Sequence, residues 1–200
     1  MREKNRSAWL RESLMYSSIL QAHENVLTFF TSAITNSEGN PTELWLVTKY
    51  HEYRSLQDYL RQHTLSAKVM LQMMASICSG LAHLHSETSG NQAKIPVAHC
   101  NLTSRNILVK DNLSCCIGDF RLAVFKYKNM VNVPEDATVG NVRYMAPELL
   151  SGSVSAMSFE AFKHADVYAV GLVMWEICQR ESNCGGKSAV HLHTYIHHYN

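Results

Sequence analysis

The apolar residues of this 200-residue chain recur in patterns that predict both helices and strands. The clearest helix is expected over Leu65–His85, where one face collects apolar residues at steps of three and four positions: Val69, Met73, Ile77, Leu81 and Leu84. A second is expected over Phe162–Cys178, which is apolar nearly all round. That pattern is typical of a helix in the middle of a core.

The first third of the chain predicts one helix and then two strands. An approximate helical stripe covers Ser7–Leu20, and Val26–Ile34 is rich in residues that favour strands. The apolar run Leu44–Thr48 predicts a strand buried on both faces. A short helix is expected over Ser55–Gln62, with Ser55 as its N-cap.

The middle of the chain predicts a small hairpin and then a long irregular stretch. Two short strands, Ile107–Val109 and Cys115–Ile117, flank the turn sequence Lys110-Asp111-Asn112. Residues 119–158 show no sustained period, and a stretch of that length without regular structure is usually functional. The elements together predict an α+β fold.

Composition narrows the class of protein. Hydrophobic residues make up 46% and charged residues 18%, a balance that argues against disorder. The net charge is +1, so there is no basic face to suggest nucleic acid or an anionic membrane as a partner. No window reaches the roughly 18 apolar residues of a membrane span, and the N-terminus does not resemble a secretory signal. We therefore expect a soluble, cytoplasmic chain of one domain.

The cysteines and histidines give little support to a metal site. None of the six cysteines forms a Cys-x-x-Cys pair, so zinc ribbons and redox motifs are not expected and reduced thiols are. Four of the eleven histidines lie near the C-terminus: His191, His193, His197 and His198. Metal binding there is conceivable, but a solvated tail is the more ordinary interpretation.

Three short strings carry candidate chemistry. The first covers His99–Asn106, the second is Asp119-Phe120-Arg121, and the third covers Met145–Glu148. In order they follow the kinase catalytic loop H-R-D-L-x-x-x-N, the metal-binding D-F-G and the A-P-E that closes the activation segment. Any one alone is weak evidence, but the three in this order and spacing are specific.

The chain resembles the kinase domain of the transforming growth factor β, activin and bone morphogenetic protein receptor serine/threonine kinases from about Trp9 to Cys178. Several strings are similar to the type I branch: His23–Leu27, Leu44–Val47, Gly80–His85, Arg105–Lys110 and Val139–Glu148. The resemblance implies a protein-kinase-like fold, with a partial small lobe of one helix and two strands over residues 1–50. It further implies an incomplete, mainly helical large lobe over 51–180, followed by an atypical tail over 181–200.

Several parts of the kinase machinery are missing or altered under this resemblance. The first glycine is Gly39, so the phosphate-covering loop is absent, and with it the strand lysine that grips the phosphates. The family pattern Trp-x-Arg-Glu-x-Glu-x-Tyr puts Leu14 where the ion-pair glutamate is expected. Arg121 replaces the glycine of D-F-G, and Cys100 replaces the loop arginine.

The catalytic positions are also degenerate. Asn101 stands where the family has the aspartate base, and Thr103 stands where it has a lysine. An amide cannot accept a proton near neutral pH, and losing a positioned base costs about 10²- to 10⁴-fold in rate. His99 and Asp166 match residues that support the loop, so we expect structural roles for both.

Other positions of the nucleotide site persist. The resemblance implies Mg²⁺ ligands at Asn106 and Asp119, which offer the oxygens that Mg²⁺ prefers. It implies an adenine site at Thr48, Lys49, His51 and Leu108. Without a cofactor, Asn106 could brace the loop and Asp119 could cap a turn. We expect binding of ATP and Mg²⁺ to be weak or absent.

Three functions compete at this point. The chain could be a pseudokinase that binds type I or type II receptor kinases or SMAD proteins, since Thr31–Glu43 lies where type I receptors present their SMAD-selecting loop. It could instead be an ATP-dependent serine/threonine kinase with reduced activity, or a truncated product with no function. In the family, the kinase domain lies on the cytoplasmic face of a membrane receptor.

Overall fold

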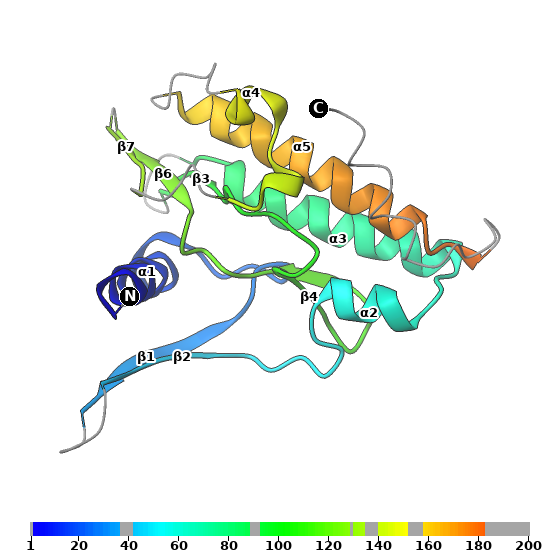
Figure 1. Cartoon of the computed structure of the whole chain (residues 1–200), viewed down its shortest axis with the longest axis horizontal. Coiled ribbons are helices and arrows are strands. Elements are labelled where there is room, and N and C mark those ends of the chain that lie inside the picture. The colour runs from blue at the N-terminus through cyan, green and yellow to red at the C-terminus, as the bar shows by residue number, and fades with distance from the viewer. Residues whose placement is uncertain are drawn as a thin grey trace.

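Two long antiparallel helices form the centre of the molecule. The computed structural model describes residues 2–36, 42–88, 93–128, 130–134, 140–151 and 158–182, with side chains from residue 6 onward. Helices α3 (Ala67–His85) and α5 (Phe159–Cys178) lie side by side (Figure 1). Leu65, just before α3, donates its backbone N–H to Arg180, just after α5, as expected for an antiparallel pair. Fully buried side chains fill the core around this pair: Met73, Ile77, Leu84, Val173 and Ile177.

The predicted helices of the large lobe are confirmed. Helix α2 covers Leu56–Gln62, and the Ser55 hydroxyl accepts the Asp58 N–H at 3.2 Å, which makes Ser55 the expected N-cap. Helix α3 begins two residues later than predicted. Ser66 is its N-cap, and the Ser66 hydroxyl accepts the Val69 N–H at 3.4 Å.

The predicted hairpin is also confirmed. Strands β4 (Ile107–Val109) and β5 (Cys115–Ile117) pair antiparallel. A separate sheet has the order β3-β6-β7 and consists of β3 (Val97–Ala98), β6 (Val124–Tyr127) and β7 (Met130–Asn132).

Residues 119–158 contain more regular structure than the sequence predicted. They hold β6 and β7, a 3₁₀ turn η2 (Val142–Tyr144) and the short helix α4 (Pro147–Leu150). Each element has three or four residues, which is too few for a hydrophobic period to show. The description of this stretch as irregular was therefore wrong.

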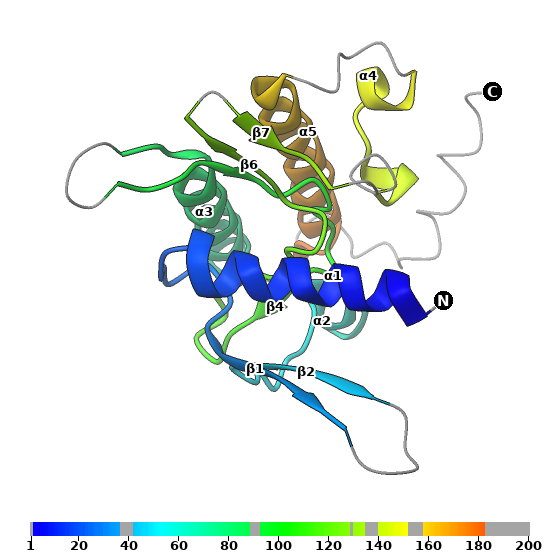
Figure 2. The same ribbon diagram turned by 90° about the vertical axis from the view of Figure 1, so that its left-hand side faces the viewer.

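The small lobe has the predicted one helix and two strands. Helix α1 (Arg2–Leu14) continues into a π-helical turn, η1 (Met15–Ile19), and is followed by β1 (Phe29–Thr35) and β2 (Glu43–Thr48). The β1–β2 hairpin projects away from the α3–α5 pair, and α1 lies between the hairpin and the rest of the molecule (Figure 2). Helix α1 starts at Arg2, five residues before the predicted start at Ser7. The prediction missed these residues because they are polar and add nothing to an apolar stripe.

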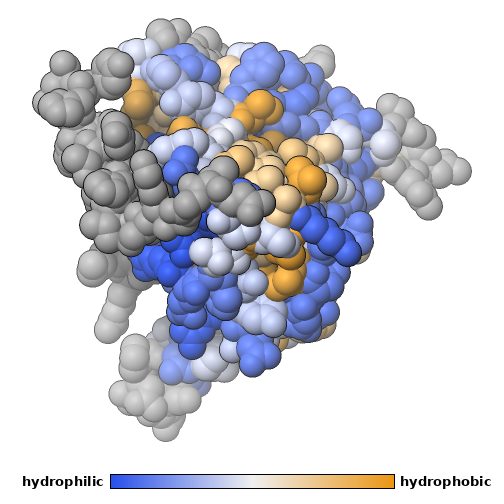
Figure 3. All heavy atoms as spheres, turned by 90° about the vertical axis from the view of Figure 1, so that its right-hand side faces the viewer, coloured by the Kyte–Doolittle hydropathy of each residue, from blue (hydrophilic) through white to orange (hydrophobic). Residues whose placement is uncertain are grey.

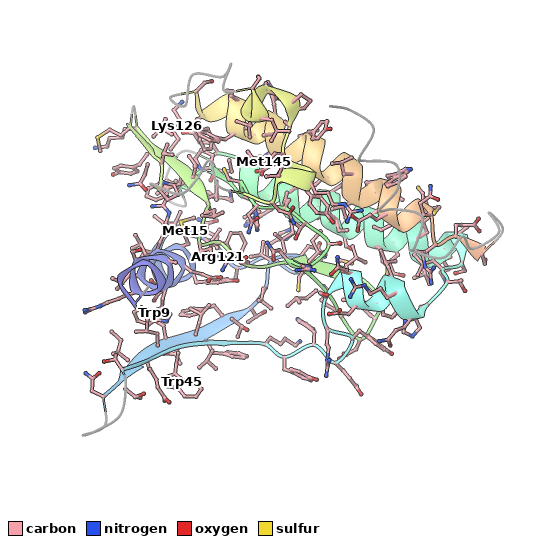
Figure 4. The ribbon with its side chains drawn as sticks, in the orientation of Figure 1. Trp9, Met15, Trp45, Arg121, Lys126 and Met145 are labelled. Atoms are coloured by element: carbon pink, nitrogen blue, oxygen red, sulfur yellow. The ribbon has the colours of Figure 1, made fainter. Side chains whose placement is uncertain are left out.

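The prediction that Leu44–Thr48 is buried on both faces is wrong. Its side chains alternate between half-buried and exposed, and Trp45 is 50% exposed and Val47 41%. Successive residues of a strand point to opposite faces, and only the face that carries Leu46 packs against the core. Helix α1 reaches the hairpin backbone through Trp9, whose indole N–H donates to the Trp45 carbonyl at 3.0 Å (Figure 4).

The remaining sequence predictions concern the thiols, the membrane and the tail. The described cysteines are all free, as expected for reduced thiols: Cys78, Cys100, Cys115, Cys116 and Cys178. No helix among the described residues has the length and hydrophobicity to cross a bilayer. The four tail histidines lie outside the described residues, and the boundaries at residues 50 and 180 stay predictions.

At the end of the molecule shown in Figure 3, apolar side chains gather at the centre, with hydrophilic ones around them.

Candidate active site

The loop of residues 99–106 is held in place by a single buried carboxylate from α5. Asp166 is 2% exposed, and its two oxygens accept the backbone N–H of His99 at 2.6 Å and of Cys100 at 2.8 Å. The His85 imidazole lies 2.9 Å from the same carboxylate. Asp166 thus has the structural role that was predicted for it, because a buried carboxylate is stable only with such partners.

His99 connects this loop to the turn before Asp119. Its ring is fully buried, with Nε2 2.9 Å from the Gly118 carbonyl and Nδ1 3.2 Å from the Asn101 backbone N–H. Nε2 therefore donates and Nδ1 accepts, which is the pattern of a neutral imidazole. His99 thus supports the loop, as predicted, by joining it to the turn before Asp119.

Three of the predicted site residues lie together. The Asn101 side-chain amide donates to Asp119 Oδ2 at 3.3 Å, and the Asn106 amide donates to the Asn101 carbonyl at 2.8 Å. The Asn101 side chain acts here as a hydrogen-bond donor. An amide does not take the proton of a hydroxyl group, as a carboxylate or an imidazole can. The structure thus brings Asn101, Asn106 and Asp119 together, with an amide at position 101.

Thr103, by contrast, serves the loop itself. It is buried, and its hydroxyl accepts the Arg105 backbone N–H at 3.2 Å. Asn101 and Thr103 line a pocket together with Tyr144, Ala146 and Phe162. With Asn101 and Thr103, this pocket has amide and hydroxyl groups where the family places an aspartate and a lysine.

Tyr144 closes the pocket from the 3₁₀ turn. Its hydroxyl donates to a Glu176 carboxylate oxygen and lies 3.1 Å from the Ser104 hydroxyl. Burial, and then the Glu176 carboxylate, raise the pKa of Tyr144 to about 12. The phenol therefore stays protonated and ties the loop to α5.

The turn Asp119-Phe120-Arg121 lies beside the loop and is anchored by Phe120, which is fully buried. Asp119 has a φ of 65°, in the left-handed region that is uncommon for residues other than glycine. Arg121 lies between α1 and the β4–β5 hairpin (Figure 4), and its Nε is 3.1 Å from Asp119 Oδ1.

The two predicted metal ligands, Asn106 and Asp119, come close to each other, but their surroundings do not fit Mg²⁺. Both carboxylate oxygens of Asp119 already have a partner, one in Asn101 and one in Arg121. No group of three histidine, cysteine, aspartate or glutamate side chains in the described part of the chain is arranged to hold a metal ion. Mg²⁺ prefers anionic oxygens with open lone pairs.

The residue of α1 that reaches this site is Glu12, whereas Leu14 holds the position that the resemblance gives to the ion-pair glutamate. Leu14 is 46% exposed, whereas Glu12 points inward and its carboxylate accepts the Phe120 backbone N–H at 3.2 Å. Burial, and then repulsion from Asp119, raise the pKa of Glu12 to about 7. Arg11 and Glu12 both match the family pattern exactly, and this match was the sequence signal that could have pointed to Glu12. Both side chains contact the segment that follows the β4–β5 hairpin. No lysine or arginine in the described residues forms an ion pair with Glu12.

Arg11 explains why α1 faces this way. Its guanidinium donates to the Ala123 carbonyl at 2.6 Å and to the Asn132 side-chain oxygen at 2.6 Å, and it lies over the Phe125 ring. Helix α1 is thus fixed to the segment after the Asp119 turn.

The predicted adenine-site residues divide into two groups. Thr48 ends β2 opposite Phe29, and Lys49 continues the hairpin with an N–H bond to the Thr28 carbonyl at 2.8 Å. His51 is buried with Nε2 3.6 Å from the Cys116 thiol, and Leu108 pairs with Cys116 in the β4–β5 register. The structure thus brings His51 and Leu108 to one cysteine, while Thr48 and Lys49 belong to the hairpin. Their roles toward a nucleotide stay predictions.

Comparison with known proteins is consistent with this geometry. The family model described as protein tyrosine and serine/threonine kinase matches residues 1–198. The chain is 46% identical over 175 residues to the TGF-beta receptor type-1 of Rattus norvegicus and of Homo sapiens, which covers 86% of this chain and 35% of each relative. It is 45% identical over 179 residues to the activin receptor type-1 of Gallus gallus, covering 88% of this chain and 35% of that relative.

The chain thus spans about a third of the length of these relatives. The matched region contains the loop held by Asp166 and the turn at Asp119, both of which have the geometry described above. The chain belongs to the protein tyrosine and serine/threonine kinase family, and it is similar within that family to TGF-beta and activin type-1 receptors.

Proposed function

We propose that the chain is a kinase-like binding module in which phosphoryl transfer is strongly impaired. The observation that carries this proposal is the Asn101 amide, which occupies the base position and donates to Asp119. Leu14 at the position of the ion-pair glutamate supports it, because kinases use a lysine–glutamate pair to place the phosphates. Kinases of this family use ATP and Mg²⁺, and we propose weak or no use of both here.

The proposed partners are type I or type II receptor kinases, or SMAD proteins, on the cytoplasmic face of the membrane. The β1–β2 hairpin supports this because it projects from the body and exposes large apolar side chains: Phe30, Ile34, Trp45 and Val47. Exposed apolar groups on a projecting element are a common feature of protein-binding surfaces.

A binding experiment tests the proposed partnership. The chain is immobilised and challenged with purified kinase domains of both receptor types and with SMAD proteins. A matched variant carries Trp45→Ser and Val47→Ser, and a control carries Val167→Ser on α5, which is 57% exposed. We expect the hairpin variant to lose binding and the control to keep it. Equal binding by both variants would remove the hairpin from the proposal, and no binding to any candidate would reject the partners.

An active kinase is the alternative function, and the support of the loop by Asp166 and His99 favours it. A phosphotransfer assay with a generic substrate, comparing wild type with Asn101→Asp plus Thr103→Lys, separates the two. The module proposal expects wild-type activity at background. Transfer by the wild type that is above background and within about tenfold of the double variant would contradict it, since a missing base costs about 10²- to 10⁴-fold. A cooperative unfolding transition would exclude the truncated-product alternative.

A further inference from the structure

The carboxylate of Asp119 is held by two donors from this chain. Arg121 Nε is 3.1 Å from Oδ1, and the Asn101 amide is 3.3 Å from Oδ2. The turn geometry makes this possible. Phe120 is buried and fixed through its N–H to Glu12, and the left-handed backbone at Asp119 folds the chain so that residue 121 returns to face residue 119.

The charge of Asp119 is already balanced by Arg121. Asp119 contributes −1 and Arg121 contributes +1, and the amides of Asn101 and Asn106 are neutral. The other carboxyl near both groups is that of Glu12, which burial and Asp119 disfavour as a charged group by raising its pKa to about 7. A divalent cation at Asp119 would stand within a few ångström of the guanidinium, where like charges repel. The two acidic oxygens that would attract a cation are engaged, so entry of the ion also has to break these contacts.

The guanidinium has donors left for an anion. Arg121 uses Nε for Asp119, its side chain as a whole is 53% exposed, and its two Nη groups are further N–H donors. A guanidinium binds phosphate oxygens through several N–H groups at once and stays charged at every physiological pH. A group that sits where a metal would sit, and that itself binds phosphate, can replace the metal as the counter-charge of a polyphosphate.

We infer that Arg121 takes the place of the divalent cation at Asp119, so that this site binds the polyphosphate of a nucleotide without a metal. The inference deepens the proposed function, since a nucleotide held this way lacks the Mg²⁺ that phosphoryl transfer requires. Arg121 is a binding residue for phosphate, and Asp119 positions it.

The test compares the wild-type chain with Arg121→Gly and Arg121→Lys, using ATP as the probe. Thermal shift and calorimetric titration are carried out with Mg²⁺ and with EDTA. We expect equal ATP affinity in both conditions for wild type. For Arg121→Gly we expect about tenfold weaker binding in EDTA and partial recovery with Mg²⁺, because removal of one exposed cation changes such contacts by roughly 1 kcal/mol. Arg121→Lys keeps the charge and should fall between them.

A second measurement needs no nucleotide. Binding of Mn²⁺ alone is followed by the electron paramagnetic resonance signal of the free ion. Wild type should bind no Mn²⁺ at this site, and Arg121→Gly should gain a site that is lost again in Arg121→Gly plus Asp119→Asn. Each variant is first shown to unfold cooperatively, and the neutral Arg121→Gln serves if Arg121→Gly does not fold.

The outcomes separate this inference from the proposed function. ATP binding by wild type that requires Mg²⁺, or Mn²⁺ binding by wild type equal to that of Arg121→Gly, would overturn the inference and leave partner binding intact. No ATP binding in either condition would overturn the phosphate role of Arg121. Loss of receptor and SMAD binding with unchanged metal-free ATP binding would overturn the partner proposal alone.

Discussion

The loop of residues 99–106 and the β1–β2 hairpin differ in how they are held. The loop is fixed by the buried carboxylate of Asp166, which accepts hydrogen bonds from two of its backbone N–H groups, and by the buried imidazole of His99. The hairpin meets the rest of the molecule mainly along one face and through Trp9, and it leaves Trp45 and Phe30 exposed. The comparison shows that buried polar groups fix the conformation of the loop, whereas the hairpin is held mainly by the packing of one face.

The largest expected effect comes from removing the support of the loop. Asp166→Ala would leave the N–H groups of His99 and Cys100 without an acceptor in a buried site. We expect a loss of about 3–5 kcal/mol in the free energy of unfolding, measured by urea denaturation. Glu160→Ala on the same helix is the matched control, because Glu160 pairs with Lys163 on the surface and contributes less than about 1 kcal/mol. A loss below about 1 kcal/mol for Asp166→Ala would show that the loop has other support.

Core and hairpin apolar residues provide the next comparison. Ile77 in α3 is fully buried, so Ile77→Ala should cost about 2–5 kcal/mol through lost burial and a cavity. Val47 in β2 is 41% exposed, so Val47→Ala should cost less than about 1 kcal/mol. Both are measured by urea denaturation at one temperature. Equal losses would mean that the hairpin is packed in solution against something that covers it.

Glu12 gives a pH-dependent effect. The folded pKa of Glu12 is raised to about 7 from an ordinary value of 4.5, so the folded state binds the proton more tightly than the unfolded state. The contribution of Glu12 is therefore greatest below about pH 4.5 and is lost as the pH rises toward about 7. The stability of wild type relative to Glu12→Gln should fall by about 3 kcal/mol across this window. A difference that is flat with pH would contradict the burial of this carboxylate.

The smallest effect is expected at a helix cap. Ser55→Ala removes the side-chain acceptor for the Asp58 N–H and should cost about 1 kcal/mol. Ser55→Asp keeps an acceptor and should restore most of the loss, as judged by the midpoint of thermal unfolding. A loss of more than about 2 kcal/mol would show that Ser55 also supports the β4 strand, with which it forms a bridge through Leu108.

The sequence predicted those parts of the fold that depend on local order. Helix α3 and the strands β4 and β5 were found because their apolar residues repeat or are bounded by turn residues. The exposure of β2 was missed, since a run of apolar letters does not say which face meets the core. Which face of β2 is covered depends on α1, and Trp9 of α1 contacts Trp45 of the hairpin, 36 residues further along the sequence.

The candidate site shows the same limit. Spacing placed Asn101, Asn106 and Asp119 together correctly, because the three strings are close in the chain and the resemblance supplies their geometry. Glu12 was missed because its inward direction follows from Arg11, which is bonded to Ala123, 112 residues away. Arg121 was seen only as a lost glycine, and its pairing with Asp119 required the backbone of the turn.

The anchoring of the loop by Asp166 also has a consequence for how the protein is made. The bond from the His99 N–H spans 67 residues of sequence, so its acceptor does not yet exist when residue 99 is synthesised. At about 5–20 residues per second, the loop waits roughly 3–13 s for α5 on the ribosome. During that interval the left-handed backbone at Cys100 has no support, and the site can be assembled only after most of the chain has left the ribosome.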